Sequence, residues 1–167
     1  MKSRRTAVIV SCAAFGLGVL ESSALLGFLP AICQHLLGEP LEIPALATWW
    51  CGEEAALADA RRRLERGVIK PAFVRAAMQP VFTSALDVSA RRAWEERLGT
   101  SPDNYVVEEW LPLSQAPVWQ DDRVEPRALM LRVFLMADGH GDYRMMPGAL
   151  ARIAGDDPGI VSSGRGG

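Results

Sequence analysis

The chain has 167 residues with 49% hydrophobic residues, 23% charged residues and a net charge of −2 at pH 7, values typical of one globular domain with a buried core. This balance offers no electrostatic basis for binding nucleic acid or an anionic membrane, so we expect neither as a partner. The three cysteines, Cys12, Cys33 and Cys51, are too widely spaced for a zinc knuckle or a redox pair, and their odd number argues against a disulfide framework. We therefore expect reduced, mostly buried thiols in a cytoplasmic protein.

The first residues are consistent with two interpretations. MKSRR precedes an uncharged apolar run, TAVIVSCAAFGLGVL, as in a secretory signal. The run has about 15 residues, whereas about 20 are needed to span a bilayer. The alternative is a buried strand, AVIVSCA, followed by a glycine-rich turn and a helix that begins near Glu21.

Apolar residues at helical spacing predict three helices, over residues 21–37, 53–66 and 89–98. Pro30 interrupts the first, which predicts a kink or two shorter helices, and Gly38 ends it. Ser89 is the expected N-cap of the third helix. The arginine run at residues 61–63 is compatible with phosphate binding, but such a run more often forms a solvated helix face.

Short apolar and β-branched runs predict six extended segments: residues 68–73, 80–84, 104–111, 117–119, 127–136 and 142–146. The fifth is nearly apolar throughout, which favours a central position in its sheet. QDDR and ADGHGD are predicted turns. These elements predict an α+β fold with packed helices and mostly antiparallel strands. We expect one domain over residues 1–155 and a flexible, Gly/Ser-rich tail over residues 156–167.

Charged residues occur inside three of the apolar segments, namely Lys70, Glu108 with Glu109, and Arg132. Adjacent strand residues point to opposite faces, so the two glutamates cannot form a face-to-face acid pair and a glycosidase site is disfavoured. Together with Arg152, these residues would suit a nucleotide, because the cations neutralise phosphates and a glutamate accepts hydrogen bonds from adenosine. The alternative, that each charge is separately paired or solvated, fits the sequence equally well.

Several unusual motifs occur in order along the chain: TWWCG, IKPAF, LPLSQAPV, LRVF and MPGALAR. Together they resemble the C-terminal part of the circularly permuted ATP-grasp family (type 2), from about Gly16 onward. A single motif of this kind would be weak evidence, whereas the ordered set is specific. The resemblance implies an ATP-grasp-like lobe or lobes, shortened relative to the family.

The resemblance also implies roles for individual residues. Glu109 matches the family's common glutamate, on a strand that links the two ATP-holding lobes and meets the adenosine, while Glu108 falls where glutamine is usual. Lys70 matches the family's KP lysine, which would contact phosphate, and Arg132 and Arg152 are carried over as phosphate ligands. The chemistry implied is activation of a carboxylate as an acyl phosphate and attack by an amine, with Mg²⁺ bridging the ATP phosphates. No catalytic residue and no protein ligand to a metal is assigned.

The chain departs from the family pattern in three respects. It is much shorter than the family's proteins. Ala13, in AAFGLG, replaces an asparagine that is a candidate metal or phosphate contact. The loop after IKPAF is VRAAMQ and lacks the glycines that would wrap phosphate with backbone N–H groups, because other residues adopt positive φ at a cost.

Three functions are therefore considered. The first is a partial ATP-grasp module of the carboxylate–amine ligase type, working with a protein that supplies the missing half or with an all-helical partner. The second is a catalytically inactive remnant that binds a protein through exposed apolar surface. The third is a small secreted protein, which the resemblance disfavours because the family's apolar start is an interior strand.

Overall fold

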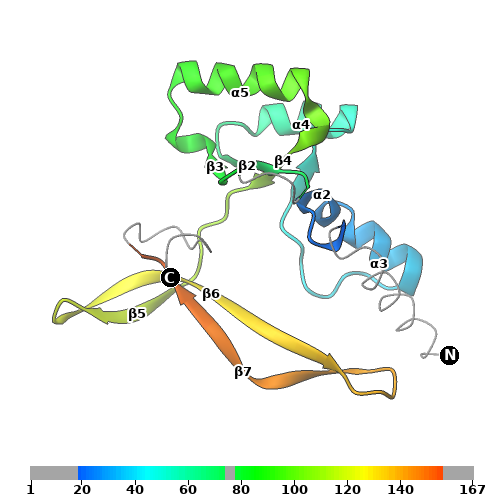
Figure 1. Ribbon diagram of the computed structural model, residues 1–167, viewed down its shortest axis with the longest axis vertical. Coiled ribbons are helices and arrows are strands. Elements are labelled where there is room, and N and C mark those ends of the chain that lie inside the picture. Colours follow the sequence, from blue (N-terminus) through cyan, green and yellow to red (C-terminus); the bar gives the residue numbers. More distant parts are fainter. Residues whose placement is uncertain (1–18, 74–77, 156–167) are drawn as a thin grey trace. The chain divides into compact units, whose positions relative to one another are not determined.

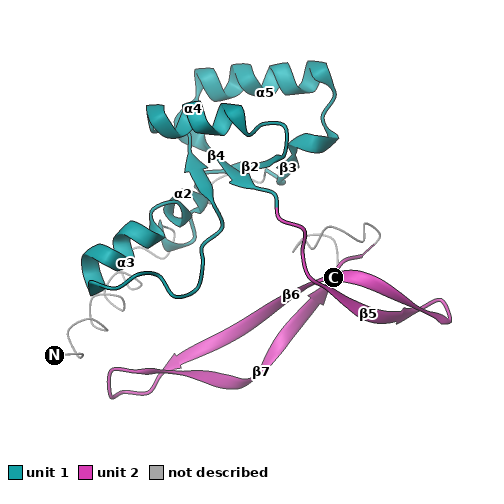
Figure 2. Cartoon of the chain, turned by 180° about the vertical axis from the view of Figure 1, so that it is seen from behind, with its two compact units in different colours: residues 1, 3–110 teal, residues 2, 111–167 magenta. Residues whose placement is uncertain are grey.

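The computed structural model describes residues 19–73 and 78–155 (Figure 1). The chain divides into two compact units, one ending at Trp110 and the other beginning at Leu111 (Figure 2). The first contains helices and a four-stranded sheet, and the second a three-stranded sheet. Every strand pair is antiparallel, which confirms the predicted α+β class. The expected N-terminal strand and the expected C-terminal tail lie outside the described residues.

The first predicted helix is two helices, α2 (Ser23–Leu26) and α3 (Leu29–Leu37). Pro30 lies in the first turn of α3, where its missing N–H costs no hydrogen bond. Gly38 ends α3 with a positive φ of 71°, and its N–H donates to the Gln34 carbonyl. No residue of α3 is buried, although its apolar spacing predicts a packed face.

The other two helices are α4 (Glu54–Arg62) and α5 (Val88–Thr100). The prediction of Ser89 as N-cap of α5 is wrong, because Asp87 holds that position. The Asp87 carboxylate accepts a hydrogen bond from the Ala90 N–H at 2.7 Å and another from the Ser89 hydroxyl at 2.8 Å. The Ala90 N–H, and after it the Ser89 hydroxyl, hold the pKa of Asp87 below its usual value.

The sheet of the first unit has the strand order β1-β4-β2-β3. Its strands are β1 (Thr48–Trp50), β2 (Gly67–Pro71), β3 (Val81–Phe82) and β4 (Tyr105–Glu109). The short 3₁₀ helix η1 (Thr83–Ala85) follows β3 directly, and a second one, η2 (Pro102–Asn104), directly precedes β4. The segments that the sequence predicts around Lys70 and Glu108 are thus both strands, and they are neighbours.

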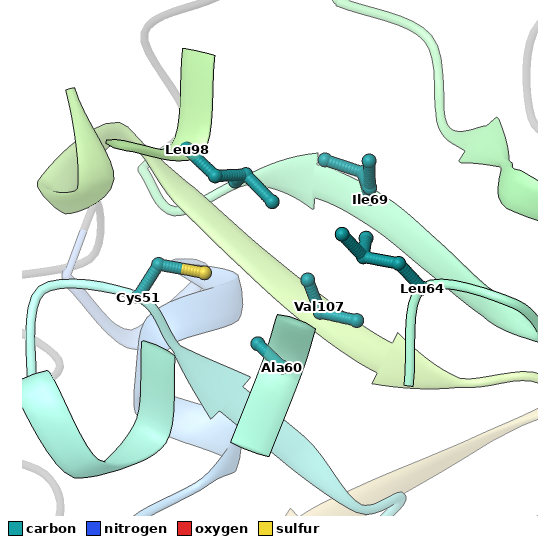
Figure 3. Close-up of a cluster of buried hydrophobic side chains, with 6 residues drawn as sticks. All are labelled: Cys51, Ala60, Leu64, Ile69, Leu98 and Val107. Atoms are coloured by element: carbon teal, nitrogen blue, oxygen red, sulfur yellow. The ribbon is translucent and has the colours of Figure 1, made fainter. Parts of the chain in front are cut away.

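The core of the first unit lies on one face of this sheet. Ile69 and Val107 are opposite each other on β2 and β4, and they pack with Leu64 and Leu98 (Figure 3). Ala60 and Cys51 complete the cluster of fully buried side chains. On the other face a smaller cluster joins Ala24 of α2 to Ala72 and Val106. The face that carries Val106 is also the face of Lys70, because these two residues are register partners.

The second unit is the sheet β5-β6-β7, formed by β5 (Gln115–Gln120), β6 (Arg123–Ala137) and β7 (Tyr143–Ile153). The predicted central position of the apolar segment is confirmed, since β6 pairs with both neighbours. β7 is longer than expected, because MPGALARI continues the strand beyond a register irregularity between Val133 and Leu135. Gly148, with φ of 114°, lies in the β7 segment opposite this irregularity.

Both turns of the second unit are built around aspartates. Asp121 and Asp122 have φ of 51° and 58° and form the two-residue connection between β5 and β6. In the next turn, the Asp138 carboxylate accepts hydrogen bonds from the N–H groups of His140 and Asp142, at 2.8 and 3.2 Å. The predicted QDDR and ADGHGD turns are therefore confirmed.

The β6–β7 ribbon has two chemically different faces. Leu129, Leu131 and Val133 share one face with their partners on β7, which are Ile153, Ala151 and Ala149. Leu131 is 60% exposed and Val133 is 50% exposed. Within residues 111–155, only Ala128 and Ala154 are buried apolar residues. We call the six residues Leu129, Leu131, Val133, Ala149, Ala151 and Ile153 the apolar ribbon face; within it only Leu129 and Ile153 are half-buried, and the other four are exposed.

In the described ranges, the helices are all too short or too polar to cross a lipid bilayer.

Candidate functional site

Two of the predicted site residues, Lys70 and Glu108, form an ion pair. The Lys70 Nζ lies 2.5 Å from the Glu108 Oε2, and both side chains come from the middle of the sheet. The register explains the contact: Lys70 is opposite Val106, and Glu108 is two residues further along β4, so the two are diagonal neighbours on one face. The sequence signal for this pair is a charge of opposite sign within each of two apolar strands. Which charges meet can be known only from the register of β2 against β4.

The two members of the pair differ in solvent access. The Glu108 side chain is 2% exposed, whereas the Lys70 side chain is 32% exposed. The Glu108 Oε1 is buried and has no hydrogen-bond partner within residues 19–73 and 78–155. Thr48 is opposite Glu108 on β1, but its hydroxyl donates to the Leu46 carbonyl instead. The pair therefore combines a lysine side chain that solvent can reach in part with a buried carboxylate.

Glu109 points to the other side of the sheet. It is exposed, lies opposite Gly67 at the end of β4, and its backbone N–H donates to the Ala47 carbonyl at 2.9 Å. The prediction that the adjacent glutamates face opposite sides is thus confirmed for Glu108 and Glu109. The two carboxylates do not act as a facing pair.

Arg132 and Arg152 belong to the second unit, on the face of the β6–β7 ribbon opposite to the apolar ribbon face. Arg152 is the register partner of Met130, and Arg132 is two residues beyond Met130 on β6, so the two guanidinium groups are diagonal neighbours. Arg132 is exposed and Arg152 is half-buried. Neither forms an ion pair with a described residue. Two unneutralised guanidinium groups on one face are suited to an anion with several oxygen atoms.

The arginine run on α4 behaves as a solvated face. Arg62 pairs with Asp59 one turn earlier on the helix. The guanidinium of Arg63 stacks over the Trp49 ring, 4.4 Å from its centroid. These contacts favour the solvated-face interpretation of the run over a phosphate site.

Metal-binding side chains do not cluster in the described part of the chain: no three residues among His, Cys, Asp and Glu are placed to hold an ion. Ala13 and residues 74–77, which the sequence associates with phosphate or metal contacts, lie outside the described ranges. Among the predicted site residues, the cations are Lys70 in the first unit and Arg132 and Arg152 in the second.

Cys51 is not suited to act as a nucleophile. Burial raises the pKa of its thiol from 9.0 to about 11, against the smaller lowering effects of the Val107 backbone and of Arg61. At pH 8 we expect alkylation of Cys51 by iodoacetamide to be roughly 100-fold slower than that of an ordinary thiol, because the fraction of thiolate falls about tenfold for each unit by which the pKa rises. Mass spectrometry of peptides containing Cys51 and the half-buried Cys33 measures this difference. Equal rates in the folded chain would contradict it, and unfolding in urea should remove the protection.

Comparison with known proteins gives consistent matches along almost the whole chain. The model of the family described as circularly permuted ATP-grasp type 2 matches residues 1–154. A putative glutamate--cysteine ligase 2-2 of Frankia casuarinae is 29% identical over 154 residues, which are 92% of this chain and 18% of that protein. A putative glutamate--cysteine ligase 2-3 of Frankia alni is 27% identical over 91% of this chain and 18% of that protein. An uncharacterized protein of Synechocystis is 26% identical over 83% of this chain and 29% of its own length. The chain thus spans less than a fifth of the two ligase-named relatives.

Proposed function

Because the chain belongs to the circularly permuted ATP-grasp type 2 family, we propose that it contributes part of an ATP site of the kind used by ATP-dependent carboxylate–amine ligases. The proposal assigns phosphate binding to Lys70, Arg132 and Arg152. It assigns contacts with the adenosine to Glu109 as an acceptor of hydrogen bonds from the ribose hydroxyls or the adenine amine.

The observation that carries this proposal is the state of Lys70. A lysine in the middle of a sheet is costly to bury unless its charge is paired or reaches water, and Lys70 has both: it pairs with Glu108 and keeps about a third of its side chain in contact with solvent. Its ammonium group is held in place by Glu108 and still has two further N–H donors. A phosphate oxygen approaching from solvent would meet a donor that is already oriented.

Glu109 lies three residues along β4 from the register partner of Lys70, a separation of roughly 10 Å at strand spacing. Because it is the last residue of β4, an extended ligand contacting both Lys70 and Glu109 would pass the end of this strand. Glu108 would form the floor of the phosphate-binding part. In the second unit, taken by itself, Arg132 and Arg152 are the proposed phosphate ligands.

The remainder of a ligase reaction requires parts that these residues do not provide. The printed names of two relatives, putative glutamate--cysteine ligases, suggest a carboxylate donor and an amine acceptor, which we propose as the substrate class. We propose that the acceptor site comes from sequence beyond the matched region, in this or a second polypeptide, or from an all-helical partner protein. Magnesium would arrive bound to the ATP phosphates, since the described residues offer no cluster for it. A cytoplasmic location, where ATP is available, is part of the same proposal.

A second candidate function has its own supporting observation. Four of the six residues of the apolar ribbon face are exposed and the other two, Leu129 and Ile153, are half-buried, and adjacent exposed apolar side chains of this kind are typical of a protein-binding surface. In that case the chain is a catalytically inactive ATP-grasp remnant, and the apolar ribbon face is its contact with a protein partner.

Isothermal titration of ATP with Mg²⁺ into the full chain separates the two candidates. We expect saturable binding that Lys70→Ala and Glu109→Ala each weaken by about tenfold or more, as loss of one charged contact does. Glu65→Gln, which removes an exposed charge of the same unit, should leave the affinity unchanged. Circular dichroism must show that every variant is folded. Absence of binding by the folded chain would refute the nucleotide proposal and leave the interaction module.

A further inference from the structure

The only charged partner that the described residues provide for the buried Glu108 is Lys70. The carboxylate is 2% exposed, one of its oxygens is unpartnered, and the nearest hydroxyl on β1 is engaged elsewhere. The stability of a buried carboxylate depends strongly on its one cation, because burial removes the water that would otherwise solvate the negative charge. The same cation is the group proposed above to meet a phosphate, so the two anions require the same ammonium group.

We infer that Glu108 is a built-in counter-anion of Lys70, which sets how strongly this lysine attracts a phosphate; the inference rests on the proposed function. The charged Glu108 carboxylate, with its Oε2 2.5 Å from the Lys70 Nζ, cancels most of the positive potential of Lys70. An incoming phosphate is also repelled by this carboxylate. The site therefore binds phosphate more weakly than the exposed lysine alone would.

The counter-anion inference predicts a gain of affinity from loss of a charge. Glu108→Gln keeps the size of the side chain and removes its charge, so inorganic tripolyphosphate should bind the full chain about tenfold more tightly than it binds wild type. Tripolyphosphate is the probe because it lacks the adenosine to which Glu109 is assigned. Glu65→Gln is the matched control, since it makes the same change in net charge at an exposed position of the same unit and should have little effect. Glu108→Met, a second neutral variant, covers the possibility that a buried amide disturbs folding.

A second readout does not depend on any ligand. The chain contains only two lysines, Lys2 and Lys70, so acetylation of both amines can be followed in one sample, with Lys2 as internal reference. Removing the carboxylate should raise the acetylation rate of Lys70 at pH 8 severalfold relative to Lys2, because the Lys70 nitrogen is released from its 2.5 Å contact with the Glu108 Oε2 and becomes accessible to the reagent.

The two readouts distinguish the possible failures. An unchanged acetylation rate in folded Glu108→Gln and Glu108→Met chains would overturn the inference, as would tripolyphosphate binding that is unchanged or weaker. Faster acetylation with no tripolyphosphate binding by any variant would refute the proposed phosphate site and the inference that rests on it, and would leave Lys70 and Glu108 as a structural ion pair. Faster acetylation together with tighter binding is the expected result.

Discussion

Lys70→Met is expected to lower the free energy of unfolding of the chain by about 2–3 kcal/mol. The substitution leaves the buried Glu108 carboxylate without its cation, and breaking a buried ion pair from one side typically costs about 3–5 kcal/mol. We expect the lower part of this range or slightly less, since the Lys70 side chain is 32% exposed and water can reach the pair from that side. Urea unfolding followed by tryptophan fluorescence measures the change.

The double variant Lys70→Met/Glu108→Met is the control for this explanation. Removing both charges leaves an apolar pair of similar volume, so most of the lost stability should return. If the double variant is as unstable as Lys70→Met, or less stable, the cost lies in packing around Lys70 and not in the orphaned charge.

Leu98→Ala is expected to lower the free energy of unfolding of the first unit by about 3 kcal/mol, within the range of about 2–5 kcal/mol for buried leucines. Leu98 is fully buried and attaches α5 to the sheet through Ile69 and Val107 (Figure 3). Truncation leaves a cavity that the sheet cannot collapse to fill, because β2 and β4 are central strands. Thermal unfolding monitored by circular dichroism checks the prediction.

Val88→Ala, on the same helix, is the matched control. Val88 is 77% exposed, and exposed substitutions of this kind usually change stability by less than about 0.5 kcal/mol. A comparable loss in both variants would mean that helix formation by α5, and not its packing through Leu98, determines the stability of the unit.

Features that depend only on local sequence, such as the alternation of side chains along a strand, could be predicted. The opposite orientation of Glu108 and Glu109 follows from the two-residue period of a strand and needs no tertiary information. The division at Pro30 follows from the chemistry of proline in the same way. The central position of β6 was predicted from its apolar composition, but burial, the usual reason for that composition, is absent from most of the strand.

Other features depended on geometry that the sequence does not display locally. Asp87 and Ser89 are both good N-cap residues, and only the backbone path shows which one meets the Ala90 N–H. MPGALARI contains a proline and a glycine, which disfavour strand, yet its pairing with β6 overrides that local preference. The Lys70–Glu108 pair joins residues that are 38 positions apart, so it required the register of β2 against β4.

The aspartate turns of the second unit have a consequence for its arginines. Strand register is strongly specified where one face is buried, but the β6–β7 ribbon has little burial to specify it. A slip of one residue between these strands would carry Arg152 to the apolar ribbon face and separate it from Arg132. The hydrogen bonds of the Asp138 turn oppose such a slip, because they fix which residues begin the pairing. An aspartate at the tip of the hairpin thereby helps to determine whether two positive charges on its strands lie side by side.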